Sequence, residues 1–175
     1  MSASPFVESW IATLAARLTA DAAGRALDLA MGRGRHALLL AQHGFITFGV
    51  DANCGAVRDA VDAAAREGLT VHGWCADLEI ASLPVAAFDV VVVARYLQRD
   101  LFDAIKASVT ARGCVIYETF TVGQLAHGTG PKSPGHLLRP GELRSIFAAW
   151  NELFYEEVDE PEAVARLVAQ RSLSG

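Results

Sequence analysis

The sequence predicts an α/β fold in which a doubly wound, mostly parallel sheet ends in a C-terminal antiparallel hairpin. Strand-like and helix-like segments alternate along residues 25–118, a pattern typical of a parallel sheet with helices on both sides. The valine run within 88–94 indicates a central strand that is buried on both faces. Two strand-like runs near the C-terminus flank the turn-forming DEPE and can pair as a hairpin. All 175 residues fit one domain.

The elements of the first half follow from hydrophobic periodicity and from the residues that begin and end helices. Ser4 and Pro5 suit the N-cap and first turn of an opening helix within residues 1–20. The apolar residues of that helix recur on one face and are Phe6, Trp10, Leu14 and Leu18. The pattern then predicts a strand at 25–30, a helix at 35–43, a strand at 46–51, a helix at 53–67 and a strand at 69–75.

The second half contains one long irregular segment. The pattern predicts a strand at 88–94, a helix at 101–110 and a strand at 113–118. The segment 119–138 contains four glycines and two prolines and is too long for a simple connection in a compact domain. We interpret it as a lid. A short helix within 140–150 precedes the two strands of the hairpin, at 152–158 and 164–171.

Composition excludes several classes of partner. A net charge of -5 gives no basic surface for nucleic acid, and no apolar run is long enough to span a membrane. Cys54, Cys75 and Cys114 are odd in number, far apart and without metal-ligand spacing, so we expect reduced thiols with packing roles and no metal site. Together with the lack of a leader-like start, this predicts a cytoplasmic protein, monomeric or homodimeric.

Acidic residues end three predicted strands: Asp28, Asp51 and Asp77. In an open parallel sheet, ligands bind outside the carboxyl ends of the strands. Asp28 precedes a glycine turn, Gly32 to Gly34, that leads into a helix, an arrangement suited to a phosphate. A carboxylate at that turn would repel a phosphate and would favour a cationic cofactor, such as the ammonium and sulfonium of S-adenosylmethionine.

Each acid also has a simpler interpretation. Asp28 and Asp51 could cap the helices that follow them, and Asp77 could bond its own backbone in a turn. Asp51 lies where an acid accepts both ribose hydroxyls, which NAD-binding folds share. Asp77 could accept from an adenine amino group while the N–H of Leu78 donates to the ring. Three acids on one sheet edge beside a glycine turn favour the cofactor interpretation.

These residues resemble the class I S-adenosylmethionine-dependent methyltransferases, especially small bacterial members related to tellurite-resistance methyltransferases. The matching stretches cover almost the whole chain and are DLAMGRGRHA, GVDAN, CADLE, FDVVVVARYLQRDLF, YETFTVGQ and GPKSPGHLLRPGEL. The resemblance implies a Rossmann-like fold with an antiparallel seventh strand. It also implies methyl transfer from S-adenosylmethionine to a small-molecule acceptor, with S-adenosylhomocysteine as product.

The resemblance also implies a set of cofactor-binding residues. These are Asp28, Ala30, Met31, Gly32 and Gly34 around the methionine part, Asp51 and Ala52 at the ribose, Asp77 and Leu78 at the adenine, and Ala94, Arg95 and Tyr96 on the sulfonium side. Three positions depart from the family pattern. Met31 replaces a small residue, Arg95 an asparagine, and Glu8 a basic residue. A guanidinium beside a sulfonium is a like-charge contact unless Arg95 points away, pairs with an acid or holds an acidic acceptor.

Candidate catalytic residues are Tyr96, Glu118, His127 and His136. Positioning alone suffices for an ionised or soft acceptor, whereas a hydroxyl or amine would need a base. Glu118 could equally be a cap, and the two histidines could be surface residues of the lid. Arg99 and Arg139 are interpreted as structural or surface residues that could also hold an acidic group.

Arg33, Arg35 and His36 form a cationic cluster at the glycine turn, suited to a methionine carboxylate or a phosphate. A phosphate would support an NAD-binding oxidoreductase, because Gly32, Gly34 and Ala37 fit a loose GxGxxA pattern, but no catalytic Tyr-Lys pair and no substrate domain accompany it. The other alternative is a protein that binds S-adenosylmethionine without turnover.

Overall fold

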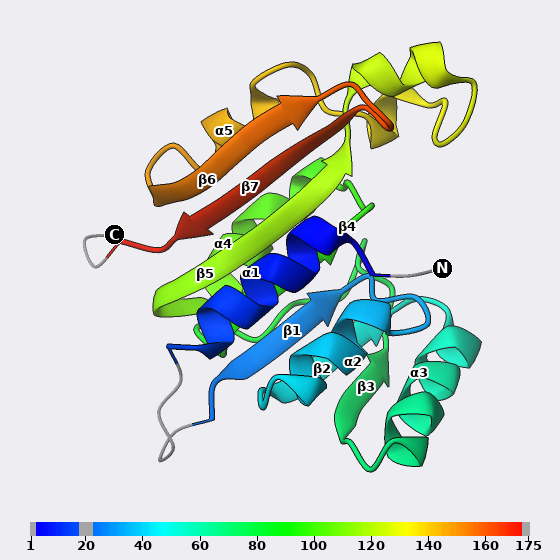
Figure 1. Ribbon diagram of the computed structural model, residues 1–175, viewed down its shortest axis with the longest axis vertical. Coiled ribbons are helices and arrows are strands. Elements are labelled where there is room, and N and C mark those ends of the chain that lie inside the picture. Colours follow the sequence, from blue (N-terminus) through cyan, green and yellow to red (C-terminus); the bar gives the residue numbers. More distant parts are fainter. Residues whose placement is uncertain (1–2, 18–22, 173–175) are drawn as a thin grey trace.

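Seven strands form a single sheet in the order β3-β2-β1-β4-β5-β7-β6 in the computed structural model, which describes residues 3–17 and 23–172 (Figure 1). The strands are β1 (Arg25–Leu29), β2 (Ile46–Asp51), β3 (Val71–Cys75), β4 (Phe88–Ala94), β5 (Val109–Phe120), β6 (Asn151–Val158) and β7 (Val164–Gln170). The first five are parallel, and β7 runs antiparallel to both β5 and β6. The predicted doubly wound sheet with a C-terminal antiparallel hairpin is confirmed.

Helices cover both faces of the sheet. They are α1 (Pro5–Ala15), α2 (Arg35–Gln42), α3 (Cys54–Arg66), α4 (Phe102–Ser108) and α5 (Glu142–Ile146), with 3₁₀ turns η1 (Arg99–Leu101), η2 (Val122–His127) and η3 (Pro134–His136). In Figure 1, α1, α2 and α3 lie in front of the sheet, and α4 and α5 lie behind it. No helix in the described ranges is long and apolar enough to cross a membrane.

Alternation along the central strands builds a core on each face. Val91 and Val93 of β4 pack with α4 and α5, whereas Val90 and Val92 pack with α1 and α2. Since successive side chains of a strand point to opposite faces, a strand covered on both sides is apolar along its buried positions, and in β4 only Asp89 interrupts the run. This is why the valine run predicted the central strand correctly.

The helix expected at 101–110 is shorter than predicted. Helix α4 ends at Ser108, and Val109 and Thr110 already belong to β5, where Val109 pairs with Phe88. Thr110 also donates its hydroxyl to the Asp89 carboxylate at 2.8 Å. Both residues are β-branched, and their side chains lose less conformational freedom in a strand than in a helix. Pairing with β4 therefore overrides the helical pattern.

The opening helix also differs in detail. It ends at Ala15, and Leu18 with residues 19–20 lies outside the described part of the chain. Pro5 occupies the first turn as predicted, but the Ser4 side chain makes no capping hydrogen bond. Instead the Ser4 backbone N–H donates to Nε2 of His36, 3.3 Å away, which ties the start of the chain to α2.

The prediction of three reduced thiols is wrong for two of them, because Cys54 and Cys75 form a disulfide. Cys75 ends β3 in register with Asp51 of β2, and Cys54 starts α3 just after that strand. Pairing of the two strands therefore brings together cysteines 21 positions apart, with 5.1 Å between their Cα atoms. Cys114 is a buried free thiol, as expected, and burial raises its pKa. The cysteine pattern no longer supports a reducing compartment.

Residues 119–138 leave and return to the sheet at one point. Backbone hydrogen bonds of 2.9 Å join Val122 N–H to the Leu138 carbonyl and Leu138 N–H to the Phe120 carbonyl. Arg99 fastens the returning arm through two bonds to Glu142, 2.7 and 3.0 Å long, and through the carbonyls of Gly135 and Leu137. The structural interpretation of Arg99 is therefore confirmed.

Candidate functional site

Three adjoining cavities lie at the carboxyl ends of the parallel strands, where β1 and β4 meet in the middle of the sheet. We name them the Asp51 cavity, the glycine-turn cavity and the arginine cavity; their volumes are about 310, 380 and 350 Å³. Ala30 lines the first two, Arg35 lines the last two, and Arg95 lines all three. This is the switch point of the strand order, where open α/β sheets bind ligands.

Two strand ends at this point have an unusual backbone. Ala30 after β1 and Arg95 after β4 have φ values of 55° and 58°, in the left-handed region that residues with a Cβ rarely adopt. The Arg95 N–H donates to the Glu118 carbonyl at 2.7 Å, which holds it in place. Strained residues of this kind concentrate at functional sites, and here they turn the chain sharply around the cavities.

The glycine turn connects β1 to α2 through two residues with positive φ, Gly32 at 54° and Gly34 at 74°. The Gly32 N–H donates to Oδ2 of Asp51 at 2.8 Å. A Cβ on Gly34 would lie 2.6 Å from Cβ of Ala60, so α2 and α3 can approach this closely only with a glycine there. The turn is thus fixed both by its own backbone and by helix packing.

Asp28 takes the simpler of its two predicted roles. Its Oδ2 accepts the Ala37 N–H of α2 at 2.9 Å, and the side chain is 1% exposed. Burial raises its pKa to about 7, partly offset by that hydrogen bond and by the charge of Arg35. Asp28 does not line the three cavities. The expectation of a charge facing the cofactor is therefore corrected to a buried carboxyl beneath the glycine turn, with a raised pKa.

The Asp51 cavity contains the other two strand-end acids. Asp51 accepts Asn53 N–H with Oδ1 at 2.8 Å while Oδ2 accepts Gly32 N–H, so it braces two turns. Asp77 accepts Glu79 N–H at 2.9 Å, the turn role proposed as its simpler interpretation. Asn53, not Asp51, caps α3. Both carboxylates nevertheless line the same cavity, as do Ala52, Leu78 and Tyr96.

Ten of the twelve predicted cofactor-binding residues line the Asp51 or glycine-turn cavity; the exceptions are Asp28 and Gly34. Met31 is 5% exposed and packs with α2 and α3, and it fits because Gly49 and Gly73 of the adjacent strands leave room for its side chain. A Cβ on Gly49 would lie only 2.0 Å from the Met31 sulfur. Methionine is therefore compatible with the turn.

The predicted cationic cluster is only partly present. Arg33 and Arg35 line the glycine-turn cavity, and Arg33 is largely exposed. His36 is buried, and burial together with the charges of Arg35 and Arg95 lowers its pKa to about 4. Its Nε2 accepts the Ser4 N–H, which requires the neutral ring. His36 is therefore not a cation for an anion at neutral pH.

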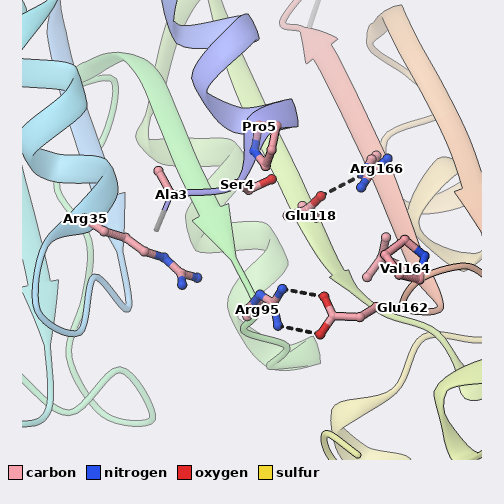
Figure 2. Close-up of a pocket in the computed structure, with 10 residues that line it drawn as sticks. Ala3, Ser4, Pro5, Arg35, Arg95, Glu118, Glu162, Val164 and Arg166 are labelled. Carbon is pink, nitrogen blue, oxygen red and sulfur yellow. Dashed lines mark hydrogen bonds and ion pairs between the residues drawn. The ribbon is translucent and has the colours of Figure 1, made fainter. Parts of the chain in front are cut away.

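The arginine cavity lies between the glycine turn and the β6–β7 hairpin (Figure 2). Arg95 donates from both terminal nitrogens to the two carboxylate oxygens of Glu162, at 3.1 and 2.5 Å, and lies over the Phe120 ring at 5.1 Å. Arg166 pairs with buried Glu118 at 2.7 Å and with Glu156 at 2.8 Å. Arg95 thus points away from β1 and pairs with an acid, one of the arrangements anticipated from sequence.

The four predicted catalytic residues fall into two groups. Glu118 lines the arginine cavity and Tyr96 the Asp51 cavity, where the Tyr96 hydroxyl donates to Gln98. His127 is half-buried and His136 exposed, and neither lines the three cavities. Glu162 and Arg166 were missed because they lie on the hairpin. The only signal was Arg166, a charge within the apolar strand VARLVAQ.

Comparison with known proteins finds one matching domain family. Residues 26–111 match the methyltransferase domain family. This match spans a little under half of the chain. The matched segment runs from β1 to the start of β5 and includes the strand ends of the Asp51 and glycine-turn cavities. No curated protein sequence matches this chain.

Solved structures share the fold of the whole chain at low sequence identity. TehB from Haemophilus influenzae is 18% identical with a TM-score of 0.76; the match covers 94% of this chain and 62% of TehB, so the chain spans less than two thirds of that protein. A S-adenosylmethionine-dependent methyltransferase from Mesorhizobium loti is 17% identical (TM-score 0.70; 94% and 98% covered). Magnesium protoporphyrin IX methyltransferase from Synechocystis PCC 6803, solved with bound SAH, is 19% identical (0.67; 94% and 83%). The class I methyltransferase fold is confirmed.

Proposed function

We propose that the protein transfers a methyl group from S-adenosylmethionine to a small-molecule acceptor and releases S-adenosylhomocysteine. The observation that carries the proposal is the pair of carboxylates, Asp51 and Asp77, in a cavity that adjoins the glycine turn, within the segment that matches the methyltransferase domain family. Carboxylates at these positions suit ribose hydroxyls and an adenine amino group.

The cofactor would occupy two of the three cavities. Asp51 and Ala52 would hold the ribose and Asp77 and Leu78 the adenine, all within the Asp51 cavity. The methionine part would lie in the glycine-turn cavity against Ala30, Met31, Gly32 and Ala94, with Arg33 and Arg35 near its carboxylate. Asp28 would act from below the turn, because a nearby cation favours its ionised form.

The acceptor would approach from the arginine cavity, which meets the glycine-turn cavity at Arg35 and Arg95. When bound, the cofactor supplies a sulfonium-activated methyl group; the acceptor forms the new bond, and the sulfur keeps the electrons of the bond that breaks. The residues of this chain then have to orient the acceptor in line and exclude water. Glu118 is held by Arg166 and burial raises the pKa of Tyr96, so neither is a ready base at neutral pH. An acceptor that is already ionised fits this site best.

Calorimetry with S-adenosylmethionine, S-adenosylhomocysteine and NADH tests the cofactor assignment. We expect S-adenosylmethionine and S-adenosylhomocysteine to bind, and we expect Asp51→Ala to weaken the binding of both by more than tenfold. The variant removes the acceptor for two ribose hydroxyls and leaves the backbone N–H groups of Gly32 and Asn53 without their acceptor. Unchanged affinity in a folded Asp51→Ala protein, or binding of NADH alone, would contradict the proposal. Release of S-adenosylhomocysteine across a metabolite and oxyanion panel separates an enzyme from a binding protein without turnover.

A further inference from the structure

The Cys54–Cys75 disulfide lies beside the Asp51 cavity. Two loops contribute residues to the wall of that cavity, and we name them the ribose loop (51–53) and the adenine loop (76–79). Cys54 directly follows the ribose loop, and Cys75 directly precedes the adenine loop. The bond therefore joins the two loops. Both cysteines are exposed, so a thiol in solution can reach the bond, and exposed disulfides are the ones that exchange most readily.

Each loop also has hydrogen bonds of its own. In the ribose loop, Oδ1 of Asp51 accepts the Asn53 N–H at 2.8 Å. In the adenine loop, Oδ1 of Asp77 accepts the Glu79 N–H at 2.9 Å. Between the loops, the Ala76 N–H donates to the Asp51 carbonyl at 3.1 Å, where β2 and β3 end. The disulfide adds a covalent link to this hydrogen bond and so fixes the distance between the two loops.

A ligand that places a ribose on one loop and an adenine on the other must contact both loops at once. In the oxidised protein their spacing is set before the ligand arrives. In the reduced protein the loops can move apart, and binding has to restore the spacing at a cost in conformational entropy.

We propose that Cys54 and Cys75 are a thiol–disulfide exchange site at which a dithiol lowers the affinity for the cofactor. The inference rests on the proposed function and names a way in which its cofactor site is regulated.

The exchange balances with a dithiol as the only reactant. One of its sulfurs attacks Sγ of Cys75, the protein S–S bond breaks, and Cys54 leaves as a thiolate. Cys54 is the first residue of α3, a helix of 13 residues, and the positive end of the helix dipole stabilises a thiolate there. The second sulfur of the dithiol then displaces Cys75 and closes the reductant's own disulfide. Two electrons and two protons thus pass from the dithiol to the two cysteines.

Calorimetry with S-adenosylhomocysteine compares oxidised protein with protein kept reduced by dithiothreitol. We expect the reduced protein to bind at least fivefold more weakly. The double variant Cys54→Ser with Cys75→Ser should bind as weakly as the reduced wild type, with or without dithiothreitol. Cys114→Ser should respond to dithiothreitol as the wild type does. Circular dichroism at the titration temperature checks that each protein is folded.

Gly44→Ala is the control for a general loss of stability. It places a Cβ at φ of 84° just after α2, at a residue that does not line the three cavities. The oxidised variant should bind S-adenosylhomocysteine as tightly as the oxidised wild type. This comparison separates the effect of the disulfide on the site from its effect on the stability of the fold.

Thermodynamic linkage provides a second readout that does not depend on calorimetry. If reduction weakens binding by a given factor, saturating S-adenosylhomocysteine must make the disulfide harder to reduce by the same factor. A fivefold factor corresponds to about 20 mV in a two-electron potential. Equilibration in mixtures of reduced and oxidised dithiothreitol, with and without S-adenosylhomocysteine, measures this shift. A disulfide with a purely structural role would show none.

The outcomes separate this inference from the proposed function. Equal affinity in the two redox states, tighter binding by the reduced protein, or a potential that S-adenosylhomocysteine does not change would overturn the inference alone. A folded protein that binds S-adenosylhomocysteine in neither redox state would overturn the proposed function and the inference with it.

Discussion

At the scale of single residues, Asp28 illustrates how a buried carboxyl supports the turn that borders the candidate site. It caps α2 from the neighbouring strand, yet it does so as a buried carboxyl whose pKa is raised to about 7. A neutral amide could accept the same hydrogen bond without the cost of burying a charge. The ionised Asp28 carboxylate destabilises the fold above pH 7. A cationic ligand bound nearby would explain why an aspartate stands at this position.

The first prediction concerns the pH dependence of stability. The folded pKa of Asp28 lies above the model value of 3.8, so the folded protein holds this proton more tightly than the unfolded chain does. The contribution of Asp28 to the free energy of unfolding therefore falls as pH rises from about 4 to about 7 and then levels off. We expect Asp28→Asn to match the wild type below pH 4 and to exceed it by up to about 4 kcal/mol at pH 8.

Urea denaturation at pH 4 and pH 8 measures this difference. Asp103→Asn removes a fully exposed carboxylate of α4 and is the control. Its free energy of unfolding should depend on pH as that of the wild type does. The same Asp28→Asn protein should bind S-adenosylmethionine more weakly at pH 8, where the wild type gains affinity as Asp28 ionises. A stability gap between Asp28→Asn and wild type that does not change with pH would show that Asp28 titrates normally.

At the scale of elements, the glycine turn depends on the packing of α2 against α3 as well as on its own backbone. Gly34→Ala must place a Cβ at φ of 74° and 2.6 Å from the Ala60 Cβ. The positive φ of a residue with a Cβ lowers the free energy of unfolding by about 1 kcal/mol, and the overlap with Ala60 lowers it by about 1 to 3 kcal/mol more. Gly44→Ala is the matched control, because its φ of 84° carries the same backbone cost with nothing within 4 Å. Thermal denaturation in which both variants lose equal stability would contradict the packing argument.

The disulfide links two elements that border the Asp51 cavity. Closing a loop of 21 residues restricts the unfolded chain, and the chain-entropy model gives about 3 kcal/mol for a loop of that length. We expect dithiothreitol to lower the free energy of unfolding by up to this amount. The double variant Cys54→Ser with Cys75→Ser should lose the same amount of stability, and dithiothreitol should not lower it further. Dithiothreitol should still destabilise the Cys114→Ser variant. A wild-type protein indifferent to reductant would show that the bond contributes nothing to stability.

Sequence reasoning succeeded for elements whose signals are local. The bounds of β2 and β4 and the acids at or just after the ends of β2 and β3 all depend on neighbours in the chain. The start of β5 at Val109 was missed because its pairing with Phe88 is a contact between distant segments. The meeting of Cys54 and Cys75 was missed for the same reason, since it requires the register of β2 with β3.

At the scale of the whole molecule, the β6–β7 hairpin completes the arginine cavity. Arg95 meets Glu162 across 67 positions of sequence, and Glu118 meets Arg166 across 48. No local pattern encodes such contacts, so the residues predicted to bind a cofactor lie at the ends of β1 to β4, whereas on the hairpin side only Glu118 was named and Glu162 and Arg166 were missed. The antiparallel strands therefore do more than extend the sheet, because they bring the charges that distinguish this site.

The last prediction tests how the hairpin is held to the sheet. The Glu118 side chain is 4% exposed and its carboxylate is matched by Arg166 of β7. Arg166→Met would leave a buried charge without a partner, and we expect it to cost roughly 3 to 5 kcal/mol. Glu118→Gln with Arg166→Met should recover most of that loss, because the neutral amide needs no cation. Chemical denaturation of the two single variants and the double variant gives the coupling energy. Additive losses would mean that the pair does not join the hairpin to β5, whereas recovery in the double variant would locate the cost in the unpaired carboxylate.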